Sequence, residues 1–318
     1  MPSRNGEHTS YELWVKAMPR MAFKSEAMLY SMHAVTCLHK TRTTGGSSPG
    51  IPAPSVVAAF KEHHQYYLEK ALNCHREDLM TLTNAGDQSG DSADILLLTA
   101  SLLRVIVLVT FSKRSLSPYT PPIEWMRLTS SYRQVWSIAW NLNGDSDSSQ
   151  VTQLALTTAR FPPYDESDDS DDIRRLWDLL QEPGSRDGFL DEEGNPSEWW
   201  PNVRSGYEAT IRHIGGIIQA MKRREPLRIV GRHLVRYPMY ADSNFINMVG
   251  DGRPRALVLV AHLFALFEQL KQFWYIETLA QREVRAIASI LPPHWQPYMQ
   301  WPLQIVDYGF PPEYMATP

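Results

Sequence analysis

Apolar residues recur every three or four positions along most of this 318-residue chain. The segment after Ser55 shows the pattern most clearly, because its apolar positions share one helical face and charged residues such as Lys61, Glu62 and Glu69 lie on the opposite face. The strict alternation of apolar and polar residues that marks a half-buried strand is nearly absent. The pattern therefore predicts an all-α protein.

The predicted helices are bounded by recognisable start and stop signals. Ser25, Ser55 and Thr120 precede apolar-periodic segments, and the side chains of serine and threonine cap helix N-termini. Pro121 fits the first turn of a helix, where its missing N–H group is not needed. The pattern places helices at residues 26–37, 55–72, 95–111, 120–139, 151–159, 172–181, 203–221, 255–279 and 284–291.

Two segments are apolar on nearly every face. Residues 95–111 are shorter than the ~20 apolar residues that a membrane span needs, and Arg104 lies in their middle. We therefore expect a buried core helix here and no membrane contact. Residues 255–270 are predicted to form the central helix of the core. Gly215 and Gly216 interrupt the apolar stripe of 203–221, which indicates close packing, a kink or room for a ligand.

The polar segments predict one large domain. Residues 1–17 are polar, lack the apolar stretch of a signal peptide and are expected to be an N-terminal extension. Residues 18–318 are expected to form a single multi-helix domain. The acidic run within residues 164–172 is predicted to be a mobile, solvated loop, because like charges repel one another and cannot be packed in a core.

The net charge indicates which classes of partner to expect, and the cysteine content indicates the cellular compartment. The formal net charge is −4, whereas a protein that grips nucleic acid by its phosphates carries a basic excess. Direct nucleic-acid binding by this chain is therefore not expected. The two cysteines, Cys37 and Cys74, are too few for a secreted disulfide framework, and they fit an intracellular, reducing compartment.

The chain contains no complete catalytic, cofactor or metal motif. Glycine-rich phosphate loops, GxSxG, HExxH and CxxC are all missing from the sequence, so we predict no cofactor and no metal. Thr36 and His39 are three residues apart and could meet on one helical face as a nucleophile and a base. His262 and Glu268 lie on the central C-terminal helix, but nothing in the sequence shows a third partner converging on either pair. If the chain is an enzyme, the groups we would expect in its site are His33, His39, His262 and Glu277.

Three segments resemble the fungal-specific transcription factor domain, the C-terminal regulatory part of zinc-binuclear-cluster activators, in its sterol-uptake-control branch. Residues 18–23 (MPRMAF) and 29–39 (LYSMHAVTCLH) resemble that branch's proline-x-x-alanine-phenylalanine motif and its helix ending in Leu-His. Residues 252–262 (GRPRALVLVAH) are similar to the family's Arg-Ala-Leu and Ala-His helix. Residues 274–303 repeat its order of a Trp, a helix, a Leu-Pro turn and then Trp-Pro.

The resemblance implies an all-helical fold, a hydrophobic ligand pocket, dimerisation or binding to another regulator, and a nuclear or cytoplasmic location. The expected ligand is sterol-like or polyketide-like. The six-cysteine DNA-binding cluster of those activators has no counterpart among the two cysteines of this sequence. DNA binding is therefore not carried over from the resemblance.

Two further functions stay open at this stage. Gene clusters for fungal secondary metabolism can encode such domains without a DNA-binding domain. The alternative function is therefore that of a stand-alone biosynthetic enzyme. It would be a cyclase, hydrolase or dehydratase acting on a polyketide or terpenoid. A third possibility is a pure interaction module that binds another protein through a helical groove.

The apolar helices supply the residues that we expect to line a ligand pocket. A close-packed core would use the same residue types, and that alternative stays open. The candidates from the two N-terminal helices and from the C-terminal pair are Leu98, Leu102, Val105, Trp136, Phe264, Phe267, Trp274 and Leu279.

Overall fold

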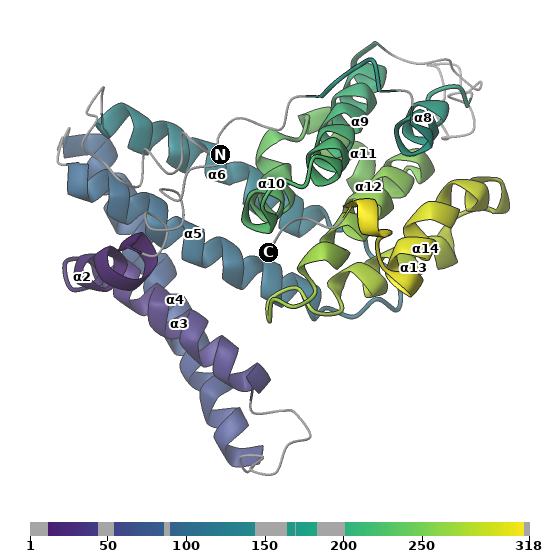
Figure 1. Cartoon of the computed structure of the whole chain (residues 1–318). Coiled ribbons are helices and arrows are strands. Elements are labelled where there is room, and N and C mark those ends of the chain that lie inside the picture. Colours follow the sequence, from purple (N-terminus) through teal and green to yellow (C-terminus); the bar gives the residue numbers. More distant parts are fainter. Residues whose placement is uncertain are drawn as a thin grey trace, which may run out of the picture. The chain divides into compact units, whose positions relative to one another are not determined.

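The computed structural model describes residues 12–43, 54–85, 90–143, 164–168, 170–182 and 201–314. Every regular element in these ranges is a helix, and none of them contains a strand (Figure 1). The prediction of an all-α fold is therefore confirmed. The predicted helix at 151–159 lies outside the described residues.

The chain divides into two compact units. Unit 1 comprises Met1–Thr110 and Ser131–Ala159, and unit 2 comprises Phe111–Ser130 and Arg160–Pro318. Both boundaries that fall in described residues lie inside helices, namely α5 (Gly90–Ser112) and α6 (Ile123–Asn143). The connection between α5 and α6 therefore belongs to unit 2, whereas the greater part of each helix belongs to unit 1.

Unit 1 is built around a helical hairpin. It begins with η1 (Glu12–Ala17) and α2 (Met18–Ala22), and the hairpin consists of α3 (Glu26–Thr43) and α4 (Pro54–Ala85), which lie side by side in Figure 1. The Ser25 side chain accepts a hydrogen bond from the Met28 N–H at 3.2 Å, as an N-cap does, so the predicted start of this helix is confirmed. Helix α4 continues well beyond the predicted end at residue 72.

Some of the buried apolar residues of unit 1 form a cluster between α2, α3, α5 and α6. Partly buried residues of α3, α4 and α6 pack against it. Its buried members are Met18, Ala22, Met28, Ala93, Leu96, Leu97, Leu98, Leu102 and Ala139.

Helix α5 is the most apolar of the long helices. By length and composition alone, Asp91–Ser112 could cross a membrane, but 67% of its apolar window is buried within the protein, as in the core helix of a globular protein. The Arg104 guanidinium lies 5.4 Å from the centre of the Tyr132 ring on α6, so the charge in the middle of this helix faces an aromatic ring.

Unit 2 surrounds one fully buried helix, α12 (Pro254–Leu266), in which every residue from Arg255 onward is buried. This helix contacts α9, α11, α13 and α14, and the prediction of a central apolar helix is confirmed. The elements of unit 2 outside α5 and α6 are α8 (Asp171–Asp178), α9 (Pro201–Lys222), α10 (Leu227–Tyr240), α11 (Ser243–Gly250), α12, η3 (Phe267–Leu270), α13 (Leu279–Ile290), η4 (Pro293–Met299), α14 (Gln300–Tyr308) and η5 (Pro312–Tyr314).

Several predicted boundaries were wrong. The helix predicted to run from 255 to 279 ends at Leu266, and after η3 the chain forms turns through residues 271–278. In these turns Glu277 adopts a φ of 40°, which no helix tolerates. Helix α6 begins at Ile123 rather than near Thr120, because two consecutive prolines precede it and the first helical hydrogen bond runs from the Met126 N–H to the Pro122 carbonyl.

Residues 164–168 of the acidic segment are held against α9. The buried Gln219 side chain accepts a hydrogen bond from the Asp165 N–H at 2.8 Å and donates to the Asp165 carbonyl at 2.9 Å. At the other end of the segment, Lys222 contacts the Asp172 carboxylate at 2.9 Å. Asp165 and Glu166 are exposed, whereas Asp172 is only 14% exposed and is paired with Lys222, so the segment is attached to unit 2 by its backbone and by one carboxylate.

The close packing expected of the Gly215 pair is found at Gly215 itself. A Cβ atom at this position would lie 2.6 Å from Cε2 of the Tyr164 ring, closer than carbon atoms pack. The absence of a side chain therefore lets the 164–168 segment lie directly on α9.

The substitution Gly215→Ala tests this contact. Alanine is the better helix former by about 1 kcal/mol, but the clash with Tyr164 should reverse that gain and lower the free energy of unfolding by about 1–3 kcal/mol. Urea unfolding measures the change. In a Tyr164→Ala background the same substitution should cost nothing, and a stabilising effect of Gly215→Ala in the unaltered chain would contradict the contact.

Candidate functional site

The predicted pocket residues of the N-terminal helices gather in unit 1. Leu98 and Leu102 belong to its apolar cluster, and Trp136 packs against that cluster from α6 while staying partly exposed. Val105, further along α5, is half-buried. The structure therefore brings three of these four residues to one cluster. Their role as ligand contacts stays a prediction.

The predicted pocket residues of the C-terminal helices lie in unit 2. Phe264 and Phe267 are fully buried and pack 5.9 Å apart, measured between ring centres. Trp125 lies 5.7 Å from Phe264 and 6.4 Å from Phe267. Phe111 completes the group, stacked 5.4 Å from Trp125 and 6.0 Å from Phe264. We call Phe111, Trp125, Phe264 and Phe267 the aromatic cluster.

The other two candidates in unit 2, Trp274 and Leu279, are not members of the aromatic cluster. Leu279 is 1% exposed and starts α13. Trp274 is half-buried in the preceding turns and packs edge-on against Tyr275 at 5.8 Å. Their contribution to a ligand site likewise stays a prediction.

The catalytic candidates of unit 1 lie on the α3–α4 hairpin. His33 is exposed and stacks on Tyr67 with 5.0 Å between ring centres. His39 is half-buried, and the Thr36 hydroxyl donates to the Met32 carbonyl at 2.8 Å. The Thr36 hydroxyl, the candidate nucleophile beside His39, is therefore bonded to the backbone of its own helix.

The catalytic candidates of unit 2 differ in burial. Glu277 is exposed in the turns before α13, whereas His262 is only 3% exposed inside α12. Nδ1 of His262 donates to the Val258 carbonyl at 2.9 Å, and its ring stacks on Trp301 at 5.4 Å with 7° between the planes. Burial lowers the pKa of His262 from its usual 6.5 to about 4, so the ring is neutral at neutral pH.

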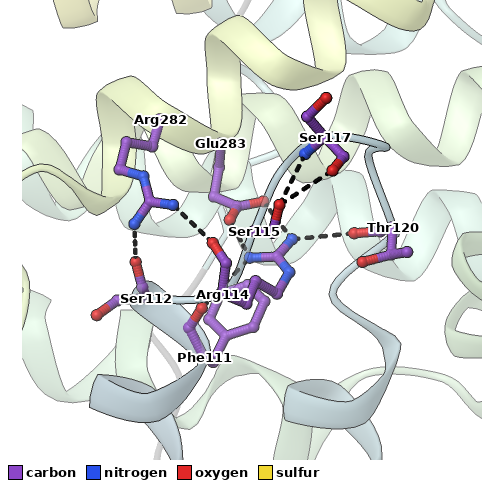
Figure 2. A network of polar contacts seen from close by, with 8 residues as sticks. All are labelled: Phe111, Ser112, Arg114, Ser115, Ser117, Thr120, Arg282 and Glu283. Atoms are coloured by element: carbon purple, nitrogen blue, oxygen red, sulfur yellow. Dashed lines mark hydrogen bonds and ion pairs between the residues drawn. The ribbon is translucent and has the colours of Figure 1, made fainter.

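A polar network joins the α5–α6 connection to α13, and we call it the clamp (Figure 2). The Arg114 guanidinium makes two contacts to the Glu283 carboxylate, one of them at 2.9 Å, and donates to the Thr120 carbonyl at 3.0 Å. Arg282 donates to the Ser112 carbonyl and, at 2.7 Å, to the Arg114 carbonyl. Arg282 thus pairs with carbonyl groups at the C-terminal end of α5, where the helix dipole favours a cation.

The clamp contains a buried charge. The Glu283 side chain is 1% exposed, and burial raises its pKa, while hydrogen bonds and charge from Arg114 act in the opposite direction. The Arg114 guanidinium also lies 4.0 Å from the centre of the Phe111 ring. The clamp therefore borders the aromatic cluster, and the two features together fix the α5–α6 connection within unit 2.

The clamp was not predicted from the sequence, although one of its three charged residues, Glu283, left a signal there. Glu283 falls on the buried face of α13 together with Leu279, Ala280, Val284 and Ile287. A carboxylate on an apolar stripe indicates a buried partner of opposite charge. The position of that partner, 169 residues earlier in the chain, carries no signal of its own.

Metal binding has no support from the part of the chain that the structure describes. No group of three or more His, Cys, Asp or Glu residues in it is arranged to hold an ion. Cys37 and Cys74 are both free thiols.

Comparison with known proteins agrees with the resemblance seen in the sequence. The chain is 24% identical over 257 residues to the Zn(2)-C6 fungal-type transcription factor afumD of Aspergillus fumigatus, covering 80% of this chain and 60% of that protein. It is 22% identical over 306 residues to a Zn(2)-C6 fungal-type transcription factor of Gibberella zeae, covering 92% of this chain and 56% of that protein. The chain thus spans less than two thirds of either relative.

These similarities confirm the resemblance to a fungal transcription factor domain and support a regulatory role. No protein-family model matches the chain. No solved structure matches it either.

The substitution Arg114→Met tests whether the clamp holds a buried charge in place. It leaves the Glu283 carboxylate without its cation, and removal of one partner of a buried pair lowers the free energy of unfolding by about 3–5 kcal/mol. Urea denaturation gives the value. Asp307→Asn is the matched control, because the Arg285–Asp307 pair is 2.7 Å long but exposed, and its loss should cost less than about 1 kcal/mol. Equal effects of the two variants would contradict the assigned burial.

His262 should make stability depend on pH. Since its pKa is about 4 in the folded chain and 6.5 when unfolded, the unfolded chain binds the proton more tightly, and stability is lost as pH falls below about 6.5. Between about pH 7.5 and about pH 5 this histidine should remove about 2 kcal/mol from the free energy of unfolding. Urea unfolding at both pH values, compared with His262→Gln, isolates its share. An identical pH dependence in the variant would rule out this assignment.

Proposed function

From the similarity to two fungal Zn(2)-C6-type transcription factors, we propose that this chain is a ligand-responsive regulatory domain of such a factor. The similarity supports this proposal most directly, because it extends over 80% and 92% of the chain and so includes both units. The net charge of −4 fits a domain that regulates rather than one that contacts DNA itself.

The ligand we propose is an apolar small molecule, sterol-like or polyketide-like. Two groups of bulky apolar side chains support it: the unit 1 cluster with Leu98, Leu102 and Trp136, and the aromatic cluster of unit 2. Ligand sites for apolar molecules are lined by such side chains together with a few polar groups that fix orientation.

The proposed setting follows from the same relationship. A regulator of this type works inside the cell, in the nucleus or in the cytoplasm before it enters the nucleus. We propose that it acts as a homodimer or together with another regulator, in the control of secondary metabolism. The enzyme alternative gains no support from the geometry: His33 and His39 lie on the α3–α4 hairpin, His262 is buried, and Glu277 is exposed in a turn. It stays a prediction from the sequence.

A reporter assay tests the regulatory role. The chain, fused to an unrelated DNA-binding domain, should change transcription of a reporter at least about threefold relative to the DNA-binding domain alone, and the change should vary with the small molecules supplied. The variant Arg114→Met is the structural control, because an unstable domain should lose the response. Reporter output equal to that of the bare DNA-binding domain under every condition would argue against the proposal.

Ligand binding is tested separately by thermal denaturation with a panel of sterols and aromatic polyketides. A molecule that binds only the folded chain raises the melting temperature, by a free energy of about 2.7 kcal/mol at a concentration one hundred times its Kd. Ligand binding is refuted if no member of the panel shifts the transition.

A further inference from the structure

Two buried hydrogen-bond donors lie on one face of α6, beside the aromatic cluster. Trp125 and Thr129 are each 1% exposed, and they are four residues apart, so their side chains are neighbours on the helix surface. Both residues belong to unit 2.

Neither donor is paired with another group of the described chain. The indole Nε1 of Trp125 and the hydroxyl Oγ1 of Thr129 are buried without a hydrogen-bond partner among these residues. Buried polar groups in native proteins are nearly always satisfied, so each exception requires an explanation. Two exceptions on adjacent turns of one helix call for a common explanation.

Other helical hydroxyls donate to a backbone carbonyl of their own helix, whereas the Thr129 hydroxyl does not. Thr36 and Thr210 donate to the carbonyl four residues earlier, at 2.8 Å and 3.0 Å, and Ser31 does the same at 2.8 Å. This back-bonding is the usual solution for a helical hydroxyl. Thr129 lacks that bond, which leaves its hydroxyl available to an acceptor outside the helix.

The surroundings determine what kind of acceptor fits. The Trp125 ring packs among Phe111, Phe264 and Phe267, with 5.4–6.4 Å between ring centres. Flat aromatic faces favour a flat apolar molecule, and the two donors favour one oxygen atom that can accept two hydrogen bonds. An ion is disfavoured here, because an isolated charge loses its hydration in such a site.

We propose that Trp125 and Thr129 are the polar anchor of a ligand site at the aromatic cluster, where the carbonyl oxygen of a flat, apolar ketone accepts from both donors. This assignment rests on the proposed ligand-responsive function and specifies the chemistry of the ligand. Because both side chains are 1% exposed, the neighbouring rings rotate aside to admit the molecule.

The test uses thermal denaturation of the full chain with 2-acetylnaphthalene as the probe and 2-ethylnaphthalene as its match without the oxygen. The ketone should raise the melting temperature by several degrees and bind about tenfold more tightly than the hydrocarbon. Thr129→Val and Trp125→Phe each remove one donor and should reduce the advantage of the ketone by about threefold to tenfold.

Thr129→Val has a second signature that a structural role would not produce. Since it removes an unsatisfied hydroxyl, the unliganded variant should melt at the same temperature as the unaltered chain or higher. The matched control is Thr210→Val, because that hydroxyl is buried, donates to the Gly206 carbonyl and accepts from Tyr237 at 3.0 Å. This control should melt lower and keep the full preference for the ketone.

Three results would overturn the assignment: equal binding of ketone and hydrocarbon, an unchanged preference in both donor variants, or a loss of stability in Thr129→Val as large as in Thr210→Val. The last result would mean that the Thr129 hydroxyl is already satisfied, for example by a bound water molecule. Failure of this anchor can be distinguished from failure of the proposed function, because a sterol or polyketide can still raise the melting temperature, and the reporter can still respond, when the anchor is disproved.

Discussion

The burial of α12 on all of its faces is the constraint on which unit 2 depends. A helix can be removed from water completely because its backbone hydrogen bonds are internal, but its neighbours must then offer apolar faces all around it. Helices α9, α11, α13 and α14 do so. The one charge in this helix, Arg255, donates to the carbonyls of Leu179 and Glu182 and lies over the ring of Trp295. The core thus tolerates a cation only where carbonyls and an aromatic face replace its water.

The requirement that buried polar groups be paired also determines the structure of the α5–α6 connection. Helix α5 ends in a buried region, where its last carbonyls need donors and the Glu283 carboxylate needs a cation. Arg282 and Arg114 meet both needs. Since α5 and α6 are also the helices in which the unit boundaries fall, the clamp attaches to unit 2 a segment whose flanking helices are largely part of unit 1.

Buried polar groups that lack a partner are also informative, because they depart from this pairing of buried charges and carbonyls. The buried side chains of Ser31, Thr210 and Arg255 all donate to backbone carbonyls. Trp125 and Thr129 depart from this rule in the same place, next to the rings of the aromatic cluster. The combination of an apolar surrounding with a small number of unsatisfied donors is characteristic of ligand sites. These two donors specify one feature of the apolar ligand that we propose, a carbonyl oxygen that accepts from both of them.

Sequence alone determined the fold class and the central helix, because a helical period and a segment without polar residues restrict local structure directly. It also located the start of α3 and the glycine against which Tyr164 packs. It could not determine where the chain turns after Leu266, since Phe273, Trp274 and Ile276 keep the helical spacing while tertiary packing selects turns. The pairing of Arg114 with Glu283, the burial of His262 and the unsatisfied donors of α6 were decided only by the tertiary structure. Each of them depends on groups far apart in the chain, and the energy of a buried polar atom is set by those neighbours rather than by its own residue type.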